Sequence, residues 1–182
     1  MGNVLITGAN RGIGLAFARV YHDRGERVVA TARRPDEAHE LRELGVRIES
    51  LDQDDDASVS ALAGRLGDTA VDLLLLNAGI LASDRLDDLD VDSVARQLST
   101  NAVGPLRVVL ALRPHLERSA SPKVVALSSV MGSIGSNREG GYYGYRASKA
   151  ALNAIARSLA ADLPFPVTLV HPGYVRTRMT GE

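Results

Sequence analysis

Short apolar runs rich in Val, Ile and Leu recur along the chain, and longer amphipathic stretches separate them. The runs are continuous rather than alternating, which is typical of parallel strands that are covered on both faces. Strands are expected at residues 4–6, 28–30, 73–76, 124–127 and 167–170, with a weaker one at 46–48. Helices are expected at about residues 12–24, 37–44, 56–66, 90–118 and 145–163. This alternation predicts an α/β fold of the Rossmann-like kind, a doubly wound parallel sheet between two helical layers.

Glycine and proline positions refine the element boundaries. Gly25 and Gly45 fall just past two expected helices, where a left-handed residue is favoured. Pro105 has no N–H to donate to Asn101, four residues before it, so the pattern at 90–118 should kink or break there. No linker, internal repeat or low-complexity tract interrupts the chain, which predicts a single domain over residues 1–182.

Composition narrows the functional classes. Of the 182 residues, 45% are hydrophobic and 24% are charged, which excludes wholesale disorder. The formal net charge of −1 argues against a general nucleic-acid or membrane-surface binder, and no apolar stretch approaches the ~18 residues of a membrane span. The absence of Cys agrees with a reducing compartment, and the first residues lack the features of a secretory leader, so the cytoplasm is the expected location.

No metal site is expected. The acidic residues from Asp52 to Asp56 begin like a calcium loop, but Ala57 and Ala63 stand where that loop needs Gly and Glu. The cluster instead fits a helix start capped by Asp56 or a neighbour. The four His residues have no mutual metal-ligand spacing.

A glycine-rich turn follows the first expected strand. From Thr7 to Gly14 the sequence reads TGANRGIG and runs straight into a helix. Such glycines let the backbone approach a pyrophosphate, and the helix start supplies free N–H groups. The spacing G-x-x-x-G-x-G differs from G-x-G-x-x-G, so a merely tight turn is the alternative.

At the end of the second expected strand stand Arg33 and Arg34 rather than an acid. Together with Arg11 they favour NADP(H) over NAD, and a solvated basic turn is the alternative.

A phenol and an ammonium stand four residues apart at Tyr145 and Lys149, and therefore on one face of a helix. The chain has nineteen Arg but only two Lys, and one of those two occupies this position. A nearby cation should lower the pKa of the phenol toward the range useful for proton exchange; an incidental surface pair is the alternative. Tyr142 and Tyr143 lack a Lys at this distance.

Hydroxyl groups end the strand expected at 124–127, where Ser128 and Ser129 lie at the carboxyl edge of the sheet. A hydroxyl there can donate to a substrate carbonyl oxygen alongside the phenol. The alternative is a Ser that only caps a turn.

These motifs, together with Asn77-Ala78-Gly79 after a strand, Asn101 and Pro172-Gly173, occur in an order that resembles the short-chain dehydrogenase/reductase family over nearly the whole chain. Within the family, residues 131–149 are similar to the C-factor-like and sniffer-like carbonyl reductases. The resemblance implies direct hydride transfer between NADP(H) and a small carbonyl or alcohol substrate, with no metal.

The resemblance also implies roles for individual residues. Tyr145 would be the general acid, Lys149 would lower its pKa and bind the nicotinamide ribose, and Ser129 would polarise the substrate oxygen. Asn101 would hold a proton-relay water. The residues implied to bind the cofactor are Gly8, Asn10, Arg11, Gly12, Ile13 and Gly14 at the phosphates, Asp52 at the adenine, Asn77, Ala78 and Gly79 at the adenosine, Pro172, Gly173 and Val175 beside the nicotinamide, and Thr177 at the phosphates.

Two features depart from the family pattern. Ser129 precedes Tyr145 by 16 residues, longer than the usual family spacing, so Ser133 is a rival for its role. The family continues after Pro172-Gly173 through a substrate-covering loop to a further strand and helix, whereas this sequence ends at Glu182. The last helix and strand are therefore expected to be lacking, and residues 167–170 to form an exposed edge strand.

The leading hypothesis is an NADPH-dependent carbonyl reductase. The alternative is a nucleotide-binding signalling or regulatory protein, or an inactive truncated relative. The resemblance also implies a homodimer or homotetramer joined through the helices that carry Asn101 and Tyr145, although no residue of the sequence by itself selects such an assembly.

Overall fold

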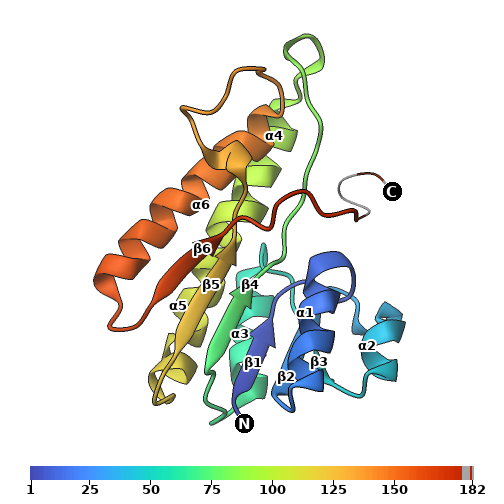
Figure 1. Cartoon of the computed structure of the whole chain (residues 1–182), viewed down its shortest axis with the longest axis vertical. Helices are drawn as coiled ribbons and strands as arrows, with labels where there is room; N and C mark the ends of the chain where they lie inside the picture. The colour runs from blue at the N-terminus through green and yellow to red at the C-terminus, as the bar shows by residue number, and fades with distance from the viewer. Residues whose placement is uncertain (178–180, 182) are drawn as a thin grey trace.

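Six strands form one parallel sheet in the computed structural model, which describes residues 1–177 and 181 (Figure 1). The strands are β1 (Asn3–Ile6), β2 (Arg27–Ala32), β3 (Arg47–Ser50), β4 (Leu73–Leu76), β5 (Lys123–Leu127) and β6 (Val167–Val170). Their order is β3-β2-β1-β4-β5-β6, and every neighbouring pair is parallel. The expected doubly wound sheet is thus confirmed, and the order of the strands reverses between β1 and β4.

Helices cover both faces of the sheet. They are α1 (Gly12–Asp23), α2 (His39–Glu43), α3 (Asp56–Leu66), α4 (Val91–Leu98), α5 (Gly104–Glu117) and α6 (Tyr143–Asp162), with short helices η1 (Pro35–Glu37), η2 (Leu86–Asp88), η3 (Ser99–Val103) and η4 (Val130–Gly132). One apolar core joins the sheet to α3, α5 and α6, and a second core on the other face joins it to α1 and α2. Alternate residues of one strand enter the two cores: Val4 and Ile6 face α1, whereas Leu5 faces the larger core.

The helix expected at 90–118 is interrupted where Pro105 predicts it. Residues Ser99–Val103 form a π-helix between α4 and α5, and buried Asn101 lies within it. A missing N–H is a recognised cause of such a break. The helix expected at 37–44 is instead the 3-10 turn η1 followed by the short α2.

Local signals at helix ends behave as expected. Gly25 and Gly45 both have positive φ, 78° and 74°, just after helices. Asp55 rather than Asp56 caps α3, since its carboxylate accepts from the backbone N–H of Ala57 at 2.9 Å. The acidic cluster is therefore a helix start.

Strand β6 lies at the edge of the sheet, as expected. Leu169 and Val170 are each 37% exposed, although the strand has the apolar composition of an interior one. Within the part of the chain that the structure describes, no helix combines the length and the apolar character needed to cross a membrane.

Candidate active site

The predicted site residues gather at one edge of the sheet, because parallel strands all end on the same side. The turn from Thr7 to Gly14 follows β1, and Asn77-Ala78-Gly79 follows β4. These two turns flank the point where the strand order reverses, which is where open α/β sheets bind ligands. The other turns at this edge hold Arg33 after β2, Asp52 after β3, Ser129 after β5 and Pro172 after β6.

The glycine turn is built so that side chains would not fit. A Cβ on Gly14 would lie 2.4 Å from the Gly8 carbonyl oxygen, and a Cβ on Gly8 would lie 2.9 Å from the Cα atom of Ala78. Gly8 also has a φ of 63°, which side-chain-bearing residues rarely adopt. Helix α1 starts at Gly12, and its N-cap Arg11 makes no side-chain capping bond. The start of α1 presents the backbone N–H groups of a first helical turn, and the residues of the glycine turn fit a dinucleotide pyrophosphate.

Thr7 and Asn77 lock the two turns together. The Thr7 hydroxyl oxygen accepts from the backbone N–H groups of Asn77 and Ala78, both at 3.0 Å. The Asn77 amide donates to the carbonyl oxygens of Thr7 and Gly8, both at 2.9 Å. Sequence reasoning assigned Asn77 to the cofactor but gave Thr7 no role; a hydroxyl at the end of a buried strand was the available signal.

The basic residues after β2 do not act as a pair. Arg34 forms an ion pair with Glu37 at 2.7 Å. Arg33 and Arg11 are exposed, and neither makes an ion pair with any residue that the structure describes. The Arg34 guanidinium is thus engaged, whereas those of Arg33 and Arg11 are not paired with any described residue, and the binding of these groups to a phosphate stays a prediction.

Tyr145 and Lys149 share the buried face of α6, at 9% and 6% exposure. The Lys149 Nζ atom lies 5.7 Å from the centroid of the Tyr145 ring and donates to the Leu127 carbonyl oxygen at 2.7 Å. Burial raises the pKa of the Tyr145 phenol, and a hydrogen bond with Ser129 opposes that rise. The expected lowering of this pKa by Lys149 is thus wrong for the chain by itself, because loss of hydration outweighs the other effects. Burial also lowers the pKa of Lys149, to about 8.

Ser129, rather than its rival Ser133, lies beside the phenol. Its side chain bonds Tyr145, and its hydroxyl oxygen accepts from the Met131 backbone N–H at 3.2 Å. The exposed Ser133 hydroxyl instead pairs with that of Ser136 at 2.8 Å. Between η4 and α6 the chain before Tyr145 forms a loop.

Asn101 is held by three hydrogen bonds. Its Nδ2 atom donates to the Ile80 carbonyl oxygen at 2.8 Å and to the Ser148 hydroxyl at 2.9 Å, and its Oδ1 atom accepts from the Ile80 N–H at 2.8 Å. A Cβ on Gly79 would lie 3.0 Å from Asn101 Oδ1 and 3.9 Å from Lys149 Nζ, so these groups are neighbours. Both N–H bonds of the Asn101 side chain are used internally, which makes this side chain a fixed support.

Two supporting residues were missed from the sequence. Ser148 links Asn101 to α6, because its hydroxyl accepts from the Asn101 amide at 2.9 Å and donates to the Tyr145 carbonyl oxygen at 2.8 Å. Buried Asp84, in the loop after β4, caps α6 from outside the helix: its carboxylate accepts from the N–H groups of Tyr143 and Gly144. The contacts of Ser148 with Asn101 and of Asp84 with the start of α6 have no local sequence signal, since each joins residues far apart in the chain.

The segment after β6 runs back along the edge of the sheet toward α1 (Figure 1). A Cβ on Gly12 would lie 3.3 Å from the Thr177 side chain, so Thr177 lies against the glycine turn, and its contact with the phosphates stays a prediction. Pro172, Gly173 and Val175 are exposed along this path. At the opposite end of the edge, Asp52 is half-buried, and its carboxylate accepts from the Asp54 N–H at 3.0 Å.

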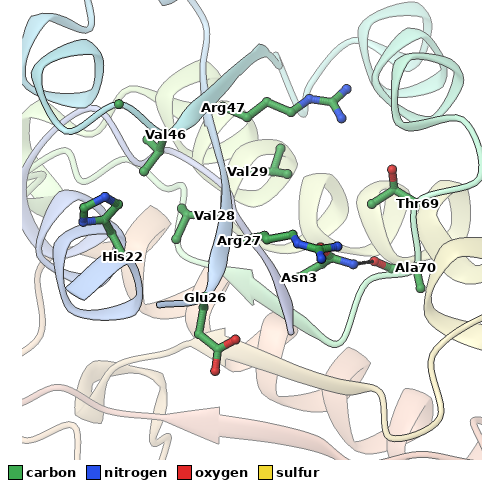
Figure 2. A pocket seen from close by; sticks show the side chains of 11 residues that line it. Asn3, His22, Glu26, Arg27, Val28, Val29, Val46, Arg47, Thr69 and Ala70 are labelled. Carbon is green, nitrogen blue, oxygen red and sulfur yellow. Dashed lines mark hydrogen bonds between the residues drawn. The ribbon is translucent and has the colours of Figure 1, made fainter. Parts of the chain in front are cut away.

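A hollow of about 570 Å³ lies away from this site (Figure 2). Figure 2 shows it lined by Asn3, Arg27 and Arg47, which begin β1, β2 and β3. It therefore opens at the amino edge of the sheet, opposite the glycine turn, and has no part in the candidate site.

Burial of Lys149 predicts a pH dependence of stability. Between pH 8 and 10 the unfolded chain holds a proton on this amine that the folded chain has released, because the pKa falls from 10.5 to about 8 on folding. The free energy of unfolding should therefore rise with pH in this window, by up to about 3 kcal/mol from this residue. Above pH 10 the raised pKa of Tyr145 makes the free energy of unfolding fall as the pH rises, because the folded chain then holds a proton that the unfolded chain has released.

Urea unfolding of wild type and Lys149→Met at several pH values isolates this contribution. The wild type should gain stability relative to the variant as the pH rises from 8 to 10. A constant difference between the two proteins would show that the amine keeps its ordinary pKa.

Comparison with known proteins agrees with this geometry. A family model described as short chain dehydrogenase matches residues 2–182. The 1-hydroxy-2-glutathionyl-2-methyl-3-butene dehydrogenase of Rhodococcus sp. (strain AD45) is 39% identical over 188 residues, which span 100% of this chain and 81% of that protein. The C-signal protein of Myxococcus xanthus is 45% identical over 115 residues, 61% of this chain and 69% of that protein.

Two solved carbonyl reductases match the fold closely. The carbonyl reductase Sniffer of D. melanogaster superposes with a TM-score of 0.93 at 31% identity, covering 100% of this chain and 84% of that one. The NADPH-bound carbonyl reductase from chicken fatty liver has a TM-score of 0.94 at 32% identity, covering 100% and 79%. This chain is thus shorter than the Rhodococcus dehydrogenase and than both carbonyl reductases.

Proposed function

The chain belongs to the short-chain dehydrogenase/reductase family of oxidoreductases, and from this premise we propose that it uses NADPH to reduce an aldehyde or ketone to an alcohol. The observation that carries the proposal is the cluster of Tyr145, Lys149 and Ser129. This cluster lies beside Gly79, in the turn after β4 that contacts the glycine turn. A phenol, an ammonium and a hydroxyl suffice to bind and protonate a carbonyl oxygen as it gains charge. Both solved carbonyl reductases named above support the same class of substrate.

NADPH fits the residues at the carboxyl edge. The cofactor, when bound, supplies the hydride. The backbone N–H groups at the start of α1 suit its pyrophosphate, and Asp52 and the Asn77–Gly79 turn suit its adenosine half. Arg33 and Arg11 suit a 2′-phosphate, because each is a cation without an ion pair among the described residues. The Lys149 amine suits the nicotinamide ribose, and Pro172, Gly173 and Val175 suit the nicotinamide.

Tyr145 is proposed as the proton donor. Burial raises the pKa of its phenol, so that the group is protonated at neutral pH, as a general acid must be. The Ser129 hydroxyl can donate to the same substrate oxygen, since it already bonds the phenol. Asn101, fixed against Ile80 and Ser148, supports the path by which the phenol would regain a proton.

The experiment that tests the function is an assay of the purified chain with NADPH and a panel of aldehydes and ketones. The oxidation of NADPH is measured for each compound. Reduction of at least one carbonyl, with stoichiometric alcohol, is expected. Tight NADPH binding without turnover on any member of the panel would reject the proposal.

The cofactor preference depends on Arg33. Arg33→Ala should weaken NADPH binding about tenfold or more and leave NADH binding unchanged, because only NADPH carries the 2′-phosphate. Arg34→Ala is the matched control, since its guanidinium is already paired with Glu37. Fluorescence titration of both cofactors measures the effect, and equal losses for NADPH and NADH would contradict the assignment.

A second candidate function rests on the similarity to C-signal. The name of that relative favours a signalling role, and in this chain cofactor binding rather than turnover would then be the relevant property. The assay above separates the two candidates, because this second one expects binding and no reduction.

A further inference from the structure

The π-helix leaves the backbone carbonyl of Thr100 without a helical donor. The Gly104 N–H donates to the Ser99 carbonyl oxygen, five residues earlier. The next donor in this register would be position 105, opposite Thr100, but Pro105 has no N–H. In ordinary α-helical register the donor for Thr100 would be Gly104, which is already used. The Thr100 carbonyl therefore needs a partner from elsewhere.

Gln53 supplies that partner from the turn after β3. Its Nε2 atom donates to the Thr100 carbonyl oxygen at 2.6 Å and to the Ala78 carbonyl oxygen at 3.3 Å. The residue is 4% exposed, so this amide lies in the interior rather than on a solvated surface. One side chain thus joins the π-helix to the turn that follows β4.

Asp54 adds a second attachment to the same helix. Its two carboxylate oxygens accept from the Ser99 hydroxyl at 2.7 Å and from the Thr100 hydroxyl at 2.5 Å. Gln53 and Asp54 therefore hold consecutive residues of the π-helix, immediately before Asn101.

The packing around Gln53 is tight enough to exclude a side chain at Gly104. A Cβ there would lie 2.8 Å from Gln53 Cγ and 3.2 Å from Gln53 Nε2. Gly104 has an ordinary helical φ of −56°, so the backbone itself does not require glycine. The missing Cβ instead makes room for the Gln53 side chain.

We propose that Gln53 is a positioning residue for catalysis: it replaces the N–H that Pro105 lacks and thereby fixes the π-helix that carries Asn101. The inference rests on the proposed reductase function. Asn101 in turn bonds Ile80 and Ser148, and Ser148 bonds the Tyr145 carbonyl, so a shift at Thr100 is transmitted toward the proton donor. The same turn holds Asp52, which the family resemblance assigns to the adenine.

Gln53→Met tests the proposal because it keeps the side-chain length and removes both N–H donors. The kcat for carbonyl reduction should fall about tenfold, since small displacements of a site cost this much or more. The KM for the carbonyl and the Kd for NADPH should stay within about twofold of wild type, because no cofactor contact is removed. Amide exchange of residues 99–104, measured without cofactor, should become about tenfold faster.

Four further variants separate positioning from a general loss of stability. Gly104→Ala should reproduce the loss of kcat, and adding it to Gln53→Ala should cost little more, because the clashing side chain is gone. Asp56→Asn is the matched control: it lies in the same region and pairs with Arg107 at 2.8 Å, so kcat and the exchange at 99–104 should not change.

Each outcome bears on one proposal. An active wild type with unchanged kcat in Gln53→Met overturns the inference about Gln53 and leaves the proposed function standing. A wild type that reduces no carbonyl overturns the proposed function. Faster amide exchange at residues 99–104 in Gln53→Met would in that case still show that Gln53 stabilises the π-helix. If Gln53→Met does not fold, Asp54→Ala, at an exposed position, decides by the same two measurements.

Discussion

Replacement of Tyr145 by Phe should lower the kcat for carbonyl reduction by about 10³-fold, within the range that a positioned proton donor contributes. The substitution removes one oxygen and keeps the ring, so the packing of the buried face of α6 is preserved. Without the phenol, the Ser129 hydroxyl remains beside the proposed position of the substrate oxygen, and this group is a far weaker acid.

Binding of NADPH to Tyr145→Phe should remain within about twofold of wild type, because the groups proposed to hold the phosphates are untouched. The variant therefore separates chemistry from binding. Single-turnover reduction and fluorescence titration of NADPH give the two quantities. Turnover close to that of wild type would show that Tyr145 is not the acid.

Two neighbouring tyrosines provide matched controls. Tyr143 is 39% exposed, and Tyr142 precedes α6 in a left-handed conformation. Neither has a Lys one helical turn further on. Tyr142→Phe and Tyr143→Phe should each retain kcat within a few-fold of wild type, so a large loss in Tyr145→Phe alone locates the proton donor.

The parts of this fold that the sequence predicts well are those set by local rules. The runs at 73–76 and 167–170 become strands at those same residues, because buried parallel strands need continuous apolar residues. The helix at Asp56–Leu66 has the predicted bounds, since an acidic cap precedes an amphipathic pattern. The position of the π-helix follows from the missing N–H of Pro105.

The same locality explains the predicted catalytic pair. Tyr145 and Lys149 are one helical turn apart, so their shared face depends only on helix geometry. The direction in which the pKa of Tyr145 shifts could not be predicted from helix geometry, because it depends on how deeply α6 is buried against η4 and the π-helix.

Contacts between distant residues account for what the sequence did not reveal. Gln53 and Thr100 are 47 positions apart, and Asp84 caps a helix that begins 59 positions later. The pairing of Arg34 with Glu37 is closer in sequence, but it needs the 3-10 turn η1, where an ordinary helix was expected. Side-chain amides and carboxylates of this kind have many candidate partners until the fold selects one.

Substitution of Gly14 by Ala should abolish NADPH binding, with a loss of affinity of at least about 100-fold, and should cost about 1–3 kcal/mol of stability. A Cβ at this position would lie 2.4 Å from the Gly8 carbonyl oxygen, 2.5 Å from Asn77 Nδ2 and 2.9 Å from the Ala9 Cα. Two of these atoms belong to the backbone of the same turn, so no side-chain rotation relieves the contact. The turn itself has to move, and with it the N–H groups that would face the phosphates.

Gly64→Ala is the matched control for that substitution, because Gly64 lies within α3 and a Cβ there has no neighbour within 4 Å. It should raise the free energy of unfolding by about 0.5–1 kcal/mol, as glycine costs this much inside a helix, and leave NADPH binding unchanged. Cofactor titration and urea unfolding of both variants measure the contrast. If folded Gly14→Ala binds NADPH like Gly64→Ala, the turn after β1 does not hold the pyrophosphate.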